Sequence, residues 1–309
     1  MTWARLAFRL QPSSIGFAAF VCLGLAVASL LLTSDMRSVL EACGTPGEPK
    51  ACTVIFSFQD THGEAVIMTQ MGIGLAMYGV PLALGVPIVT REIELRTAMI
   101  AWPLAGSRLT WLVWRALPVL VVGLFLISTM AFAAEELAKA YFPHSDIGFD
   151  RHGSRGISLV TRSALMLVAG IALGAIIGRV LPALLVGIGL SVALSAFLGA
   201  ALPQWLSSTV LTGPETEIFG PGPLRTGAQY RLADGQLISA QEGEILTQVL
   251  YEENGGVEPD PALLPQQVIF GIAAERYGEV LARESAVVLG AATLAGGLAA
   301  AVVRRRRPE

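Results

Sequence analysis

The sequence predicts an all-α integral membrane protein with six transmembrane helices. Hydrophobic residues make up 53% of the 309 positions and charged residues only 15%, whereas soluble domains carry about 25% charged residues. The charged residues gather between long apolar stretches, and each of these stretches approaches the length that a helix needs to cross about 30 Å of hydrocarbon. We therefore expect the chain to cross a membrane repeatedly.

The expected spans number six and cover residues 14–33, 65–89, 112–134, 163–177, 184–202 and 285–303. The first is longer than the hydrophobic region of a signal peptide, so we expect it to be retained. The fourth and fifth are kept apart because a single helix over both would be far too long for a bilayer. Pro182 also disfavours a helix through that point, and the expected hinge is 178–182.

Arginine placement predicts the orientation, because cytoplasmic loops of membrane proteins carry an excess of Arg and Lys. The arginines collect on one predicted side, before the first span, after the second, after the fourth and after the sixth: Arg5, Arg9, Arg91, Arg96, Arg108, Arg179, Arg304, Arg305, Arg306 and Arg307. The segments 34–64, 135–162 and 203–284 fall on the other side, and acids outnumber arginines in the longest. Both termini are expected in the cytoplasm of a bacterial cell.

Two of the three cysteines fall in one expected external segment. Cys43 and Cys52 close a loop rich in Pro and Gly, and an oxidising exterior lets a disulfide persist. We therefore expect a bond between them, with two free thiols as the alternative. Cys22 lies in an apolar run and is expected to be a small buried hydrophobe.

The external segment 203–284 is expected to begin with irregular structure, because Gly and Pro are frequent in its first half. Its second part, 266–283, has helical spacing of apolar residues, so one or two external helices are expected to lead into the last span. A disordered loop is the alternative, which its aromatic and aliphatic residues disfavour. Residues 1–309, this segment included, are expected to form a single domain.

Few residue patterns in the sequence point to catalysis. HExxH, Cys/His sets with zinc-ligand spacing and the phosphate-binding GxxxxGK[ST] loop are missing from the 309 residues. The three histidines, His62, His144 and His152, all fall in expected external segments. No catalytic residue and no metal site are predicted, and if ATP drives this protein another chain must bind it.

The richest polar segment lies between the second and third spans, at residues 90–104. It holds alternating charges, a threonine and then apolar residues: Arg91, Glu92, Glu94, Arg96, Thr97, Met99, Ile100 and Trp102. Read as a helix, Glu92 and Arg96 form an i,i+4 pair. Such a short amphipathic helix is either an interfacial anchor, with Trp102 among the headgroups, or a docking element for a soluble partner.

The run GVPIVTREIELRTAMIAWPLAGSRLTWLVWR resembles the coupling region of type-2 ATP-binding-cassette exporter permeases, especially the compact actinobacterial type. That family carries an acidic residue, a Thr, an apolar stretch, Ser-Arg and then Trp, which here are Glu92 or Glu94, Thr97, 98–102, Ser107-Arg108 and Trp111. The family usually has Gly before the Thr, where this chain has Arg96, so local backbone geometry can differ. Residues 1–6 and 174–183 resemble the family's N-terminal amphipathic helix and its turn between spans four and five.

The resemblance implies a six-span permease that dimerises with an identical or paralogous copy in the cell membrane. It pairs with separate cytoplasmic ATPase subunits, which hold ATP and Mg. The implied ATPase-coupling residues are Arg91, Glu92, Glu94, Arg96, Thr97, Met99, Ile100 and Trp102, and the N-terminal interfacial helix carries Trp3, Arg5 and Arg9.

The cargo expected for such an exporter is a hydrophobic or amphipathic small molecule, for instance an antibiotic, a metabolite or a lipid-like compound. Apolar span faces without buried charge favour this class, and membrane lipids are expected partners while nucleic acid is not. A membrane-anchored sensor or scaffold is the alternative, in which the acidic external segment binds a ligand or a protein.

Overall fold

A computed structural model of the chain describes residues 11–42, 51–97, 107–141, 148–207, 212–214, 224–255 and 264–306; at 40–42, 51–61, 201–207 and 212–214 only the backbone is described. Within these ranges six helices are long and apolar enough to cross a membrane, which confirms the predicted fold class. Contacts divide the chain into two compact units. The bundle unit comprises Met1–Pro143, Arg151–Phe197 and Leu281–Glu309, and the sheet unit comprises His144–Asp150 and Leu198–Val280.

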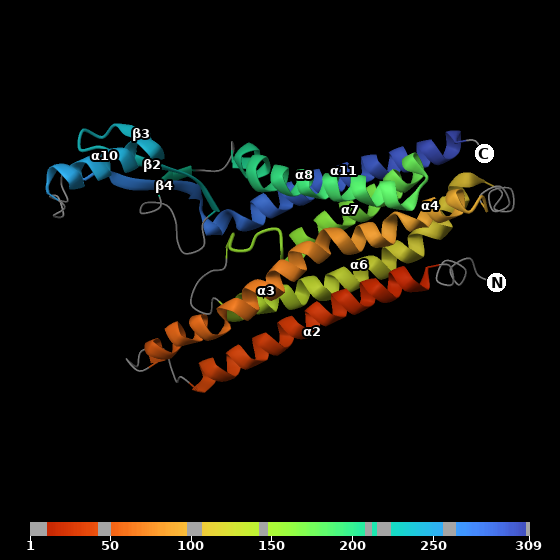
Figure 1. The fold of residues 1–309 in the computed structure, drawn as a ribbon, viewed down its shortest axis with the longest axis horizontal. Coiled ribbons are helices and arrows are strands. Elements are labelled where there is room, and N and C mark those ends of the chain that lie inside the picture. Colours follow the sequence, from red (N-terminus) through yellow and green to blue (C-terminus); the bar gives the residue numbers. More distant parts are fainter. Residues whose placement is uncertain are drawn as a thin grey trace. The chain divides into compact units, whose positions relative to one another are not determined.

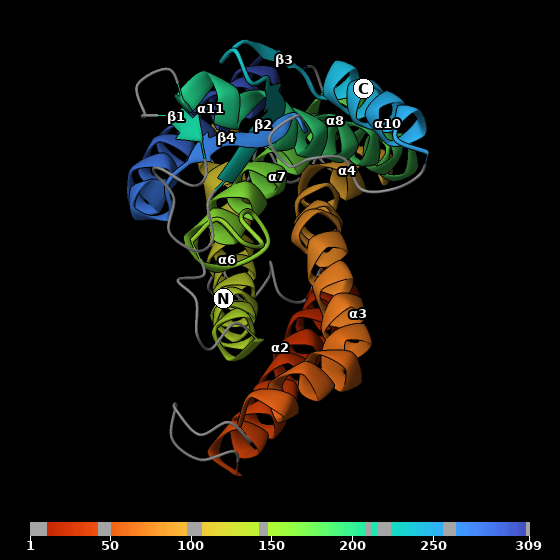
Figure 2. The same cartoon turned by 90° about the vertical axis from the view of Figure 1, so that its left-hand side faces the viewer.

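The helices that form or enter the bundle unit are α2 (Pro12–Ala42), α3 (Ala51–Gly85), the short α4 (Pro87–Glu94), α6 (Arg108–Tyr141), α7 (Gly156–Ile177), α8 (Val180–Ser207) and α11 (Tyr277–Arg305). Helix α2 packs against α6 and α3, and α7 packs against α3 and α6. Figures 1 and 2 show these four helices running side by side along the bundle.

The three longest helices extend well past the length that a bilayer requires. Helices α2, α3 and α6 contain 31, 35 and 34 residues, and at about 1.5 Å per residue each exceeds the roughly 30 Å of hydrocarbon. The prediction of loops at 34–64 and 135–162 is therefore wrong in part, because helix occupies much of both. Apolar side chains continue past the first charges and pack together there, in a cluster of Met36, Val66, Leu137 and Ala140.

The predicted break between the fourth and fifth spans is confirmed. Helix α7 ends at Ile177, and Gly178 follows in the left-handed conformation with φ of 73°, its N–H donating to the Gly174 carbonyl at 3.0 Å. This is the glycine C-cap that ends many helices. Helix α8 begins at Val180, so Pro182 lies in a first helical turn, where proline is tolerated.

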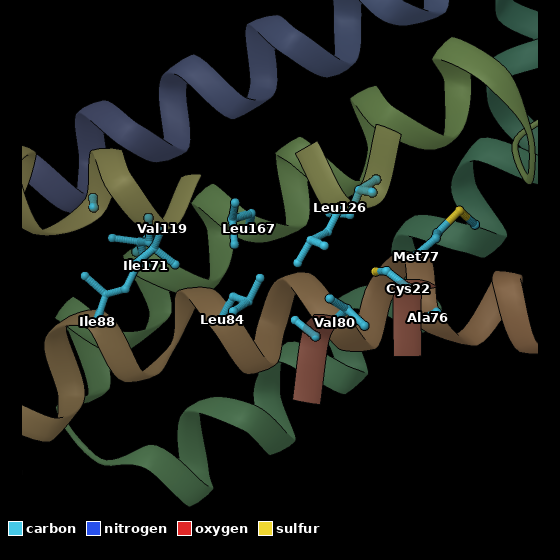
Figure 3. Close-up of a cluster of buried hydrophobic side chains, with 14 of the residues drawn as sticks. Cys22, Ala76, Met77, Val80, Leu84, Ile88, Val119, Leu126, Leu167 and Ile171 are labelled. Atoms are coloured by element: carbon cyan, nitrogen blue, oxygen red, sulfur yellow. The ribbon is translucent and has the colours of Figure 1, made fainter. Parts of the chain in front are cut away.

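Close packing of α3 and α4 on α7 depends on small residues. A Cβ atom at Gly85 would clash with the Leu167 carbonyl oxygen, and one at Gly174 would lie 2.7 Å from the Val86 carbonyl oxygen. Glycines of this kind let membrane helices approach closely. Figure 3 shows Leu84 of α3 beside Leu167 of α7 in the buried core, which also contains Cys22, as predicted.

The sheet unit contains a four-stranded antiparallel sheet in the order β1-β4-β2-β3, formed by β1 (Thr212–Pro214), β2 (Leu224–Arg231), β3 (Leu237–Ser239) and β4 (Gln266–Ile272). The helical prediction for 266–283 is therefore wrong over its first seven residues, which form β4. The short 3-10 helix η1 (Ala274–Arg276) follows, and α11 starts at Tyr277. The prediction of irregular structure in the first half of 203–284 is wrong where β1, β2 and β3 form.

Helix α10 (Ala240–Glu253) follows β3 and begins with a capping box. The Ser239 backbone N–H and hydroxyl both donate to the Glu242 carboxylate, at 3.0 and 2.8 Å, and the Glu242 N–H donates to the Ser239 hydroxyl at 3.2 Å. These hydrogen bonds to its charged form lower the pKa of Glu242. The unit has its own small apolar core of Phe149, Ile272 and Val280.

Candidate functional site

The predicted coupling segment begins as helix α4, directly after α3. Val86 forms the turn between the two helices, and Pro87 occupies the first turn of α4, where its missing N–H is not needed. The first part of α4 is buried, and the Thr90 hydroxyl donates to the Val86 carbonyl at 2.9 Å. Residues 94–97, which end α4 and follow it, are exposed. The described part of the segment thus has a buried base and an exposed tip, residues 94–97.

Glu92 links this base to helix α6. Its carboxylate lies 2.8 Å from Nη1 of Arg115, and both residues are only 8% exposed. The Trp111 side chain adds a hydrogen bond to the same carboxyl group. Because a buried charge is costly unless it is paired, each residue requires the other, and α4 is held to α6.

The expected i,i+4 pair between Glu92 and Arg96 is wrong. Helix α4 ends at Glu94, and Arg96 lies in the turn that follows, with its N–H donating to the Ile93 carbonyl at 3.1 Å. Arg96 has φ of 57°, in the left-handed region that glycine adopts without strain. The position where the resembling permeases carry glycine is therefore one whose backbone favours glycine here as well.

Arg115 lies about two turns into α6, and the structure buries it against Glu92. The position of Arg115 in the sequence gives a partial indication of where its side chain lies. It lies four residues after Trp111 in α6, so both side chains point to the same helix face. The distance in sequence between Glu92 and Arg115 hides the pairing itself.

Two further arginines bind helix carboxyl ends at the same end of the bundle unit, which we name the arginine end. Nη1 of Arg108 donates to the carbonyls of Arg304 and Arg306, at 3.0 and 2.6 Å, where α11 ends. Nη1 of Arg306 donates to the carbonyl of Ala175 at 2.5 Å, in the last turn of α7. These contacts join α6, α7 and α11 through carbonyls that helices leave unsatisfied at their ends.

The opposite end of the bundle unit holds a buried ionic cluster centred on Glu284, which is 1% exposed. Its carboxylate accepts hydrogen bonds from Nε of Arg162 at 2.7 Å and from the Ser158 hydroxyl at 3.0 Å, and it pairs with His152. Both residues lie in segments that the sequence predicts to be external, and the structure shows in addition that their side chains are largely buried. Together they join the start of α7 to α11.

An apolar groove of about 650 Å³ runs along α2 and α3. Its walls contain aromatic, aliphatic and small residues and no charged side chain: Phe17, Phe20, Val21, Gly24, Leu25, Gly72, Leu75, Ala76, Gly79, Val80 and Ala83. Its volume lies within the roughly 300–1,000 Å³ of ligand sites. The groove is a surface suited to an apolar molecule or an apolar helix.

Several predicted site residues lie outside the described ranges: Trp3, Arg5, Arg9, Cys43, Met99, Ile100 and Trp102. Cys52 belongs to α3, but the structure describes only its backbone, so the disulfide between Cys43 and Cys52 stays a prediction. Of the coupling residues, the structure brings only Glu92 into the core, while Arg91 is half-buried and Glu94, Arg96 and Thr97 are exposed. Among the described residues no group of His, Cys, Asp or Glu could hold a metal ion.

Six long apolar helices define a multi-pass membrane protein, and the short helix after the second span is built into its bundle. The chain belongs to the family described as ABC-2 membrane transporter related, which matches residues 15–202. The match extends from α2 into α8 and includes α4. No curated protein and no solved structure matches the chain. The family generally consists of membrane subunits that work with an ATPase partner.

Proposed function

We propose that the chain is the membrane subunit of an ATP-driven exporter, and that a separate cytoplasmic chain binds and hydrolyses ATP. The observation that carries this proposal is helix α4, whose buried base is fixed to α6 by the Glu92–Arg115 ion pair while its tip, residues 94–97, is exposed. An exposed tip on a fixed base is what a partner protein needs in order to move the spans.

The contacts of α4 support a mechanical role. Helix α4 packs against α7 and continues from α3 through a single turn residue, and its ion pair reaches α6. A displacement of the tip therefore acts on three spans at once, through rigid helices that are in direct contact. In the proposed complex Glu94, Arg96 and Thr97 face the ATPase, and the predicted contacts of Met99, Ile100 and Trp102 extend the same surface.

The proposed orientation places the arginine end in the cytoplasm, with both termini. Arg91, Arg96, Arg108 and the arginines that end α11 would all lie on that side, as the positive-inside pattern requires. The ATPase is cytoplasmic, so this is also the side on which the α4 tip must lie. A second copy or a paralogue of this chain would complete the pathway, as the family resemblance implies.

The proposed cargo is a hydrophobic or amphipathic small molecule. The groove along α2 and α3 supports this class, because its lining holds aromatic and aliphatic side chains and no charge. In an assembled pair of permeases, the same surface is available either to cargo or to the second copy. A charged, strongly hydrated substrate would find no compensating polar group there.

Charge reversal at the α4 tip tests this function. The protein is expressed in a bacterial membrane with its candidate ATPase, purified, and assayed for bound ATPase and for ATP turnover stimulated by hydrophobic compounds. Glu94→Arg should weaken ATPase retention about tenfold, equal to about 1.4 kcal/mol, with a parallel loss of stimulated turnover. Glu64→Arg is the matched control, because Glu64 is an exposed acid in the first half of α3, about six turns away from α4.

Normal retention and turnover in Glu94→Arg, with normal assembly, would remove α4 as the coupling element. If no ATPase copurifies with the unaltered protein, the exporter proposal fails. The sensor or scaffold reading, in which the sheet unit binds an external ligand or protein, would then take its place.

A further inference from the structure

A second cavity lies at the arginine end, where α7 and α11 end. It has a volume of about 400 Å³ and is lined by Ile176, Leu298, Ala301, Val302, Arg305 and Arg306. Four of these side chains are apolar and two are arginines, so the lining divides into a hydrocarbon part and a cationic part. This composition differs from the groove on α2 and α3, whose lining has no charge.

The spacing of the lining residues in α11 makes them one stripe of the helix. Leu298, Ala301, Val302 and Arg305 occupy positions i, i+3, i+4 and i+7, which lie on one helix face. Along this face the apolar residues come first and Arg305 follows at the end of the helix. The face is therefore apolar first and cationic at Arg305. A helix that leaves the hydrocarbon of a bilayer for its charged surface meets its surroundings in the same order.

Arg306 lines the cavity and connects the end of α11 with the end of α7. Its Nη1 donates to the carbonyls of Ala175 and Ile176, at 2.5 and 3.3 Å. The guanidinium can approach because Gly178 has no side chain, and a Cβ atom there would clash with Arg306. These bonds hold the guanidinium in place beside the end of α7, and both use the same nitrogen.

Arg305 supplies the second cation. Its side chain is exposed, and no hydrogen bond or ion pair joins it to any residue that the structure describes. An arginine has five N–H donors in a planar fork that matches the oxygens of a phosphate group. Two arginines and four apolar residues that line one cavity thus offer donors to an anion and a hydrocarbon surface to a chain attached to that anion.

We propose that this cavity binds one anionic phospholipid, with its phosphate group between Arg305 and Arg306 and the upper part of an acyl chain along Leu298 and Ile176. A free anion would leave the apolar wall unused, and a neutral lipid would leave two cations without a net negative partner. Basic pockets between membrane helices at the cytoplasmic surface favour such headgroups. The proposal depends on the six-span fold and not on the transport function.

Lipid binding by the purified full chain tests the proposal. Native mass spectrometry in detergent compares added phosphatidylglycerol with phosphatidylcholine of the same acyl chains. The unaltered chain should retain phosphatidylglycerol preferentially, and Arg305→Gln should weaken that retention about fivefold, because one arginine is removed from the headgroup site. Arg304→Gln is the matched control: Arg304 precedes Arg305, is exposed, and does not line the cavity.

A second pair of variants tests the apolar wall. Leu298→Trp fills the cavity and should reduce phosphatidylglycerol retention, whereas Leu294→Trp, one turn earlier and outside the lining, should not. Equal loss in Arg304→Gln and Arg305→Gln would show a general surface-charge effect and overturn the site. Retention of phosphatidylcholine equal to that of phosphatidylglycerol would overturn it too. Displacement by millimolar inorganic phosphate, with no effect of Leu298→Trp, would assign the cavity to a free anion and not to a lipid.

Discussion

The two ends of the bundle unit use arginine in different ways. At the arginine end, Arg108 and Arg306 donate to backbone carbonyls where α11 and α7 finish, and the described ion pair there joins Arg115 to Glu92. At the opposite end the arginines face carboxylates, in the pairs Arg37–Glu136, Arg155–Glu135 and Arg162–Glu284. At the arginine end the guanidinium groups bind mostly backbone carbonyls, whereas at the opposite end carboxylates balance their charge.

The difference follows from helix direction. The carboxyl end of a helix carries a partial negative charge and unsatisfied carbonyls, which attract cations. Helices α7 and α11 both end at the arginine end, so guanidinium groups are held there without the loss of their positive charge. This excess is what retains a membrane segment on the cytoplasmic side. Helix geometry and membrane orientation therefore favour the same arrangement of arginine.

The largest effect is expected at the opposite end, from Glu284→Ala. The change leaves Arg162 buried without its carboxylate, and removing one partner of a buried ion pair costs on the order of 3–5 kcal/mol. Ser158 and His152 would lose their contacts with the same carboxylate. The free energy of unfolding, measured by titration with sodium dodecyl sulfate in mixed micelles, should fall by this amount.

The double variant Glu284→Met with Arg162→Met is the control, because it removes both buried charges together. It should recover most of the stability, since replacing a buried pair by apolar residues is often neutral. A double variant as unstable as the sum of its parts would mean that the cluster acts through packing and not through charge.

The next effect is expected at the arginine end, from Arg115→Met. Glu92 would lose its cationic partner while it remains buried, but it is less deeply buried than Glu284 (8% against 1% exposed), so we expect a smaller cost of about 2 kcal/mol. The variant should also reduce stimulated ATP turnover in the assembled complex, because α4 is no longer held to α6. The free energy of unfolding and the ATP turnover, measured on the same preparation, distinguish a structural role of the ion pair from a coupling role. Loss of stability with full turnover would show that the pair is structural only.

Removing a helix cap should have a smaller effect. Arg108→Gln takes away the donor to two carbonyls at the end of α11, and such a contact with a helix end is worth about 0.3–1 kcal/mol. Hydrogen exchange should become faster in the last turn of α11 and remain unchanged at Glu284. Arg179→Gln is the comparison, because the Arg179 side chain is exposed and makes no hydrogen bond to any residue that the structure describes. Equal exchange in both variants would argue against the cap.

The spans could be predicted because hydropathy adds up over about twenty consecutive residues, and no single residue decides it. The break at Gly178 was also local, since a glycine near a proline is a strong signal. The ion pairs could not be predicted in this way, because they join residues that are far apart in the sequence. Arg162 and Glu284 are separated by 122 positions, and only the folded bundle brings them together.

The sheet unit shows why the segment 266–283 was misassigned. Its apolar residues fit helical spacing, yet Val268, Ile269 and Phe270 are also residues that strands favour. Pairing with β2, which precedes it in the chain, decided the outcome in favour of β4. For the coupling segment, the sequence indicated the charged residues and the position, but not that Glu92 would point into the core.

The smallest effect is expected for the exposed pair of Arg37 and Glu136, whose side chains are 54% and 20% exposed and 2.6 Å apart. Water screens such pairs, so Arg37→Ala should cost only about 0.2–1 kcal/mol, and less at high salt. The buried pair of Arg162 and Glu284 at the same end should keep its effect in high salt, because solvent does not reach it. The free energies of unfolding of Arg37→Ala and Glu284→Ala, each measured at low and high salt, test this difference. If salt weakened both equally, the Glu284 cluster would be accessible to solvent, and burial would not explain why its ion pair contributes more to stability than the pair of Arg37 and Glu136.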